Sequence, residues 1–430
     1  MSATGKLVDF VCQLDADALP AATLQQAARC VLDLTGVAIA GAQTPMAAIS
    51  ARFACEQFAA GDATVIGSAK ALSVAGATWV NGAYASALDM DDGNRMAMGH
   101  PGANVIPAAL AIAEQTGASG KAFLAALVAG YEVAVRASAA RVPWYKDKMY
   151  STGIWGVFGA TAAAGKLLGF DTATLQSALG TAGSHGSFPP GGLQANHAMV
   201  KEAIAWSGMT GVSAALLAQQ NFVGPADFLD YSERWDTSAL VAGLGPDFRA
   251  IFVRAAILAT YFKPYAVCRW AHPAVDGVLE LKHRHGLRIE EIEAIEVQTF
   301  WEVTRLANPE PSNTIAAQFS IQFALAVALL HDKIGPAEVS EVQIRDPAVL
   351  ALARKVQVSV DEAFDREFPA KTMARVRIRT HCAEHRTTVE YPRGNPENPL
   401  SNEELEAKFH SLTQGLISEE RSHKLRSAIL

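Results

Sequence analysis

Apolar residues recur at helical spacing through most of the first 255 residues. In the segment 22–40, Leu24, Val31 and Leu32 fall close to one helix face. Similar patterns, separated by Pro, Gly, Asn and Asp, run through residues 105–115, 122–140, 155–168 and 203–220. The pattern therefore predicts that this part of the chain is helical.

The pattern changes near residue 260. Residues 292–300 have the composition of a strand, residues 374–380 alternate apolar and basic side chains, and residues 387–391 suit a hairpin partner. Helical patterns at 315–331 and 347–355 lie between these strands. This mixture is typical of an α+β module.

The chain returns to a helical pattern after Asn398. Ser401 is placed to cap the helix start, and Glu404 follows three residues later, as in a capping box. The sequence alone leaves open whether this last segment packs back on the first part.

Length and composition bound the class of protein. The chain has 430 residues, of which 50% are hydrophobic and 18% charged, so two domains with large cores are expected. The net charge of −7 argues against a nucleic-acid partner. The five cysteines form no CxxC pair and are expected to be free thiols. We find neither a signal peptide nor a membrane-spanning apolar run, so a cytoplasmic protein without a membrane partner is expected.

The densest polar cluster, Asp89–Arg95, is followed closely by His100. A carboxylate such as Asp91 or Asp92 can orient an imidazole, and Arg95 can bind a substrate carboxylate through two hydrogen bonds. A capped loop with an internal salt bridge explains the same residues equally well. A Mg²⁺ site is the weaker alternative, because no DxDxDG or HExxH pattern is present.

Three further segments carry candidate residues. Lys263 lies where the pattern changes, and it either holds a carboxylate at a domain interface or is a surface lysine. His272, which follows it, is explained as well by a satisfied histidine at a helix start. Lys201 begins an apolar helix, where a cation is unusual. The segment Tyr150–Gly153 precedes another helix, whose N–H groups either bind an anion or are capped by Ser or Thr.

Together these motifs resemble the MmgE/PrpD family, whose members include 2-methylcitrate dehydratase, cis-aconitate decarboxylase and iminodisuccinate epimerase. The resemblance covers nearly the whole chain. It rests on Asn81-Gly82-Ala83, Leu88–Asp92, His100-Pro101, Gly156 with Phe158-Gly159-Ala160, Phe222–Pro225, Phe262–Tyr265 with Cys268 and His272, and Ala317–Ser320.

The resemblance implies a mainly α fold with a large all-helical domain and a smaller α+β lid domain. The helical domain would take in residues 1–258 and the C-terminal helices at 399–430, and the lid residues 259–398. The resemblance also implies an active site at the domain interface, no metal or organic cofactor, and a homodimer. By motif position, Asp91, His100, Lys201 and Lys263 fall in the cleft.

Two positions depart from the family pattern. Ser86 and Tyr150 stand where the family often has histidine. A tyrosine, whose unperturbed pKa is about 10, is a poor acid for expelling hydroxide near neutral pH. It can still deliver a proton to a carbanion. The tyrosine at position 150 therefore favours an epimerase over a dehydratase.

We therefore predict a cofactor-independent enzyme that removes a proton next to a carboxylate of a small polycarboxylic acid. The best candidate is an epimerase resembling iminodisuccinate epimerase; a dehydratase, a decarboxylase and a non-catalytic binder of small acids are the alternatives. The predicted catalytic residues are His100, tuned by Asp91, together with Tyr150 and Lys201. The predicted substrate-binding residues are Arg95, Lys263, Asp92 and His272.

Overall fold

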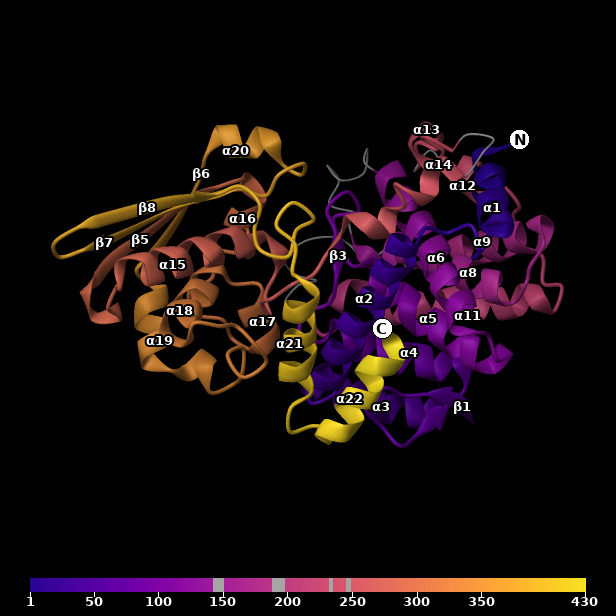
Figure 1. The fold of residues 1–430 in the computed structure, drawn as a ribbon, viewed down its shortest axis with the longest axis horizontal. Helices are drawn as coiled ribbons and strands as arrows, with labels where there is room; N and C mark the ends of the chain where they lie inside the picture. The colour runs from indigo at the N-terminus through magenta and orange to yellow at the C-terminus, as the bar shows by residue number, and fades with distance from the viewer. Residues whose placement is uncertain (142–150, 188–197, 232–234, 245–248) are drawn as a thin grey trace.

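The structure is a computed structural model, and it describes residues 1–141, 151–187, 198–231, 235–244 and 249–430. Helices dominate the first part of the chain, as predicted (Figure 1). Its longer helices are α1 (Ala3–Gln13), α2 (Ala21–Gly41), α3 (Pro45–Gln57), α4 (Val74–Ser86), α5 (Pro101–Thr116), α6 (Gly120–Ala140), α8 (Thr152–Leu167), α9 (Thr172–His185) and α11 (Ile204–Gln219). Short helices follow at α12 (Phe228–Tyr231), α13 (Thr237–Leu240) and α14 (Arg249–Phe252).

Small residues let the central helices of this part approach closely. A Cβ atom added at Gly130 on α6 would lie 2.9 Å from the carbonyl oxygen of Gly159 on α8, and one added at Gly159 would lie 2.6 Å from that of Gly130. By length and composition α6 could also cross a membrane, but 72% of its apolar window is buried inside the protein. That burial agrees with the core helix of a soluble protein.

The α+β part is built around a four-stranded sheet with the order β6-β5-β7-β8. Strand β5 runs parallel to β6 and antiparallel to β7, and β7 and β8 form the predicted hairpin. The strands are β5 (Ile292–Thr299), β6 (Val356–Val360), β7 (Ala374–Thr380) and β8 (Glu384–Val389). The helices are α15 (His272–His285), α16 (Trp301–Thr304), α17 (Thr314–Gln318), α18 (Ile321–His331), α19 (Pro347–Ala353) and α20 (Glu362–Glu367).

Some elements were not expected from the pattern. Strand β6 lies at the sheet edge, so most of its residues are not buried and alternation is weak. The pair β1 (Ala60–Thr64) and β2 (Ala71–Leu72) is likewise mostly exposed. The prediction offered a helix start at His272 but gave no range for α15, whose apolar pattern is interrupted by charged residues and ends in a last turn with four basic side chains.

The C-terminal helices α21 (Asn402–Thr413) and α22 (Glu419–Ile429) return to the helical part, where they lie against it in Figure 1. The predicted capping box is present, with Ser401 and Glu404 each bonded to the other's backbone. Lys408 on α21 forms a 2.6 Å ion pair with the buried Asp33 on α2. The mainly α, two-domain fold class is therefore confirmed.

A short antiparallel pairing ties the two parts together. Strand β3 (Gly93–Asn94) follows the first carboxylates of the predicted Asp89–Arg95 cluster, and it pairs with β4 (Thr260–Tyr261). Lys263 lies two residues after β4. The pairing therefore brings the two most polar segments of the sequence to one place.

Candidate active site

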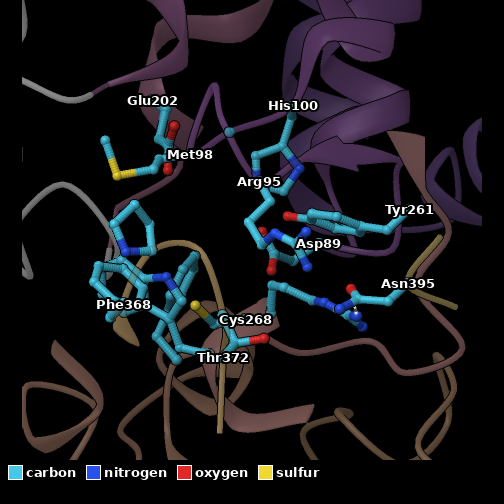
Figure 2. A pocket seen from close by; sticks show the side chains of 15 residues that line it. Asp89, Arg95, Met98, His100, Glu202, Tyr261, Cys268, Phe368, Thr372 and Asn395 are labelled. Carbon is cyan, nitrogen blue, oxygen red and sulfur yellow. Dashed lines mark hydrogen bonds between the residues drawn. The ribbon is translucent and has the colours of Figure 1, made fainter. Parts of the chain in front are cut away.

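A cavity opens where the Asp89–His100 loop meets the α+β part (Figure 2). His100 and the hydroxyl of Tyr261 point into it, and Asp89 lies beside them. Its other lining residues are Arg95, Met98, Gly99, Glu202, Cys268, Arg269, Trp270, Phe319, Phe368, Pro369, Thr372 and Asn395. The wall thus combines charged groups with a group of apolar side chains.

His100 is held by the loop that precedes it. Its Nδ1 atom lies 3.1 Å from the backbone carbonyl of Asp92 and 3.2 Å from Oδ2 of Asp91. Both are acceptors, so Nδ1 carries a proton and Nε2 is the nitrogen left for the cavity. Burial lowers the pKa of His100, but the carboxylates of Asp91 and Asp89 together outweigh it and raise the pKa to about 9. At neutral pH the imidazole is therefore protonated and able to donate a proton.

Asp89, Lys201 and Lys263 form a buried ionic group behind the cavity. Oδ2 of Asp89 lies 2.7 Å from Nζ of Lys263, and Oδ1 lies 3.6 Å from Nζ of Lys201. Burial alone would raise the pKa of Asp89, but the two ammonium groups hold it well below its usual range. Two cations outweigh one carboxylate, so the group is net positive. Asp89 faces the cavity, whereas neither lysine lines it.

Lys201 reaches this group from an unusual backbone. Residues 201–203 have φ of 43°, 56° and 57°, the left-handed region that side chains rarely adopt. Nζ of Lys201 also donates to Oε1 of Gln318 at 2.6 Å, and Gln318 donates to the carbonyl oxygen of Ala87. The strained turn therefore places one ammonium between the two parts of the chain.

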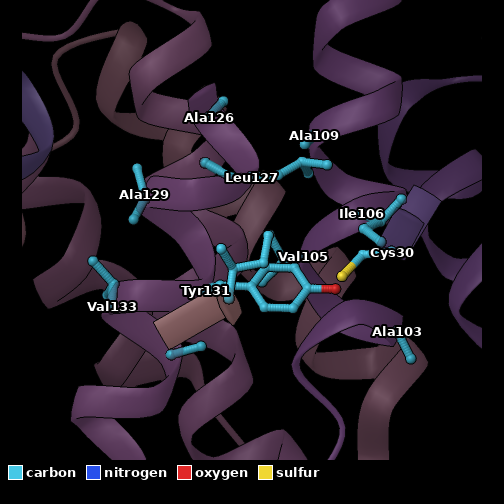
Figure 3. Close-up of a cluster of buried hydrophobic side chains, with 14 of the residues drawn as sticks. Cys30, Ala103, Val105, Ile106, Ala109, Ala126, Leu127, Ala129, Tyr131 and Val133 are labelled. Atoms are coloured by element: carbon cyan, nitrogen blue, oxygen red, sulfur yellow. The ribbon is translucent and has the colours of Figure 1, made fainter. Parts of the chain in front are cut away.

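Asp92 lies in the helical core and does not line the cavity. Its carboxylate accepts from the Tyr131 hydroxyl at 2.5 Å and from the Gly102 N–H at 3.0 Å. Burial raises the pKa of Asp92 to about 7, although the bond from Tyr131 lowers it. Figure 3 shows Tyr131 among apolar side chains, with its hydroxyl towards Cys30. Asp92 thus anchors the loop instead of facing a substrate.

His272 also lies behind the cavity. It is completely buried, its Nε2 donates to the carbonyl oxygen of Val267, and its Nδ1 accepts from Arg269 at 3.0 Å. Burial lowers its pKa well below the usual value, so the ring is neutral. This is the satisfied histidine at a helix start that the sequence left open, and it contacts Arg269 instead of the cavity.

Arg95 does line the cavity, but it is paired. Its guanidinium donates twice to Glu397, at 2.6 and 3.2 Å, and lies over the Tyr391 ring. Tyr150, predicted as the second catalytic residue, lies outside the described residues. The structure therefore brings His100, Asp91, Arg95, Lys201 and Lys263 to one region.

The helix start at Ser151 and Thr152 already holds an anion from the chain itself. Oε2 of Glu202 accepts from the backbone N–H of Thr152 at 2.8 Å and from its hydroxyl at 2.6 Å. The capping carboxylate is favoured at a helix N-terminus. The same hydroxyl accepts from the N–H of His100 at 3.3 Å. This contact links the α8 start to the catalytic candidate.

Several polar residues of the cavity are not among those predicted from the sequence. Tyr261 and Arg269 belong to the segment around Lys263. The basic side chain of Arg269 was the signal in the sequence that could have marked this segment's further site residues. Thr372 lies just before β7 and Asn395 lies in the turn after β8, and no pattern of chemical groups marks either of them. Within the described ranges, no group of three or more His, Cys, Asp or Glu side chains could hold a metal ion.

Gly93 provides a test of how Tyr261 is positioned. A Cβ atom added at Gly93 would lie 2.3 Å from the Tyr261 ring, so Gly93→Ala is expected to push that ring out of place. We expect a loss of about 1–3 kcal/mol in the free energy of unfolding, as for other overpacked sites. Urea unfolding measures it. Gly120→Ala is the control, because nothing lies within 4 Å of an added Cβ there; equal effects at both positions would contradict the prediction.

Comparison with known proteins shows that family models match most of the chain. The MmgE/PrpD N-terminal domain matches residues 5–242 and the MmgE/PrpD C-terminal domain matches residues 265–430. The chain belongs to the MmgE/PrpD family. The C-terminal match takes in α21 and α22, and the domain borders at 258 and 399 stay predictions.

Two relatives of this family member are fungal proteins. This chain is 27% identical to a cis-aconitate decarboxylase of Aspergillus terreus, over 99% of this chain and 92% of the relative. It is 24% identical to the cis-aconitate decarboxylase-like protein oryM of Aspergillus oryzae, over 99% and 94%. The first is named as an enzyme that removes a carboxyl group.

Proposed function

We propose that this MmgE/PrpD protein is a lyase that decarboxylates a small polycarboxylic acid, with His100 as the proton donor. The observation that carries the proposal is the position of His100. Its Nδ1 is fixed by Asp91 and the Asp92 carbonyl, and its protonated ring lines the cavity. The name of the Aspergillus terreus relative points to the same reaction.

The proposed reaction needs an acid more than a base. When the C–C bond to the leaving carboxylate breaks, CO₂ departs and the electron pair passes into the conjugated remainder of the substrate. The Nε2 proton of His100 then forms the new C–H bond, and the ring regains a proton from water. The Asp91 carboxylate stabilises the protonated ring before the transfer and again once the ring has regained its proton.

Epimerisation and dehydration also require a base that takes a proton from carbon. In the described part of the cavity, three of the titratable groups suit that task poorly. Burial raises the pKa of the Cys268 thiol to about 12, and it raises that of Tyr261 far above its usual value, so both stay protonated. The lowered pKa of Asp89 makes it a weak base. These groups favour decarboxylation.

The epimerase, preferred from the sequence, rests on Tyr150 and stays a prediction, because Tyr150 is not among the described residues. The predicted homodimer, the cytoplasmic location, the lack of nucleic-acid and membrane partners and the independence from cofactors also stay predictions.

An isotope experiment tests the proposal. The protein is incubated in D₂O with cis-aconitate, 2-methylcitrate or iminodisuccinate, while CO₂ release and NMR spectra are followed. We expect CO₂ release from one polyacid and one deuterium incorporated into its product. Exchange of a C–H proton without CO₂ would instead indicate an epimerase, and loss of water a dehydratase. Binding without any reaction would indicate a small-acid binding protein.

A further inference from the structure

Arg269 is a buried cation of the cavity that lacks an acidic partner among the described residues. Its side chain contacts the carbonyl oxygens of Arg393 and Pro392, at 3.1 and 3.3 Å, the amide oxygen of Asn395 and Nδ1 of His272. All four acceptors are neutral. In the described ranges no carboxylate lies within 4.0 Å of Arg269, whereas Arg95 is paired with Glu397. A buried charge without a counter-ion is costly to maintain.

The local packing fixes the plane of this guanidinium. It lies over the Tyr261 ring, 4.5 Å from the ring centre. The Asn395 turn is held against the same segment, since Phe262 donates its N–H to the carbonyl oxygen of Gly394 at 3.1 Å. Gly394 has φ of 92°, and a Cβ atom there would overlap the Phe262 carbonyl oxygen. Arg269 and Asn395 therefore meet in one defined arrangement.

Asn395 offers an unused donor at the same place. Because a guanidinium can only donate, the atom of Asn395 that it contacts must be the oxygen. The amide nitrogen then has no partner in the described part of the chain, although Asn395 is only 1% exposed and lines the cavity. The buried Thr372 hydroxyl, also on the cavity, likewise finds no partner among the residues that the structure describes. Buried donors of this kind normally have acceptors.

We propose that Arg269 and the Asn395 amide nitrogen form a subsite for one carboxylate of the substrate. A carboxylate supplies two acceptor oxygens and the missing negative charge, and the flat guanidinium suits it. The subsite belongs to the α+β part, whereas His100 belongs to the helical part, so one polyacid would contact both (Figure 2). The proposal rests on the proposed function in taking a polycarboxylic acid as the ligand.

The test measures binding separately from turnover. Propane-1,2,3-tricarboxylate serves as the probe, and its dissociation constant is measured by calorimetry. In Asn395→Asp the new carboxylate would pair with Arg269 and occupy the subsite. We expect binding to weaken by about tenfold to a hundredfold, the range of one or two charge-assisted hydrogen bonds. Arg269→Gln is expected to weaken it at least as much.

Asn398→Asp is the matched control. Asn398 is on the same turn and bonds to Arg393, but it does not line the cavity. We expect a change of less than about twofold, because a screened charge outside the site acts weakly. Equal effects of Asn395→Asp and Asn398→Asp, unchanged binding in both, or no binding by the unaltered protein would overturn the subsite. Binding that depends on Asn395 without CO₂ release would refute the decarboxylase and keep the subsite.

Discussion

Replacing His100 with glutamine is expected to lower kcat for the proposed decarboxylation by about a hundredfold to ten-thousandfold, the usual contribution of a general acid. Glutamine keeps a polar side chain of similar reach, but it has no proton to transfer. Since His100 keeps only 12% of its side chain exposed, the variant is checked for folding by circular dichroism. The measurement is steady-state CO₂ release.

The pH dependence gives an independent check on the same residue. The pKa of His100 is raised to about 9, so its acid form dominates below that pH. Activity is expected to fall as pH rises through about 9, and the fall should move to lower pH in Asp91→Asn, which removes the charge that raises the pKa. His283→Gln, a change on an exposed side chain, should leave rate and profile unchanged. Full activity in His100→Gln would remove His100 from the mechanism.

The sequence predicted the fold well where apolar periodicity is strong. The helices α2 and α6, strand β7 and the Ser401 cap lie within a residue or two of their expected positions. Strand β6 and the exposed hairpin at Ala60–Leu72 were missed, because partly exposed strands carry little alternation. Local patterns therefore predict buried elements better than edge elements.

Sequence reasoning identified the segments that meet at the candidate site, but not which of their side chains face the cavity. The polar cluster before His100 and the Lys263 segment do meet, because β3 pairs with β4. Composition could not show that Asp92 turns into the core towards Tyr131, or that His272 turns towards Arg269. Such choices depend on which neighbours can satisfy a buried polar group, and those neighbours come from distant parts of the chain.

The buried lysines and Arg269 differ in how their charges are paired. The sequence predicts a catalytic role for Lys201 and a substrate-binding role for Lys263, but Asp89 already neutralises part of their charge. Arg269 is not among the predicted site residues, yet no described carboxylate lies within 4.0 Å of its guanidinium. The proposed Arg269 subsite therefore rests on the free energy of burying a charge, and not on the position of a residue in a motif.

Replacing Asp89 with asparagine is expected to destabilise the fold by about 3–5 kcal/mol, the range seen when one partner of a buried ion pair is removed. Lys201 and Lys263 would both stay buried without a counter-charge. Asparagine is chosen because Asp89 has φ of 53°, a conformation that Asn tolerates well. Urea unfolding measures the change.

The direction in which the stability of Asp89→Asn changes with pH distinguishes the burial of unpaired lysine charges from a packing defect. Without Asp89, Lys201 keeps the burial that lowers its pKa and loses the carboxylate that raises it, so the unfolded state binds more protons. The stability deficit of Asp89→Asn should therefore shrink as pH rises towards about 10, where unpaired lysines lose their protons. Adding Lys201→Met and Lys263→Met should recover most of the loss at pH 7. A deficit that is independent of pH, or that the two methionines leave unchanged, would show that charge burial is not its cause.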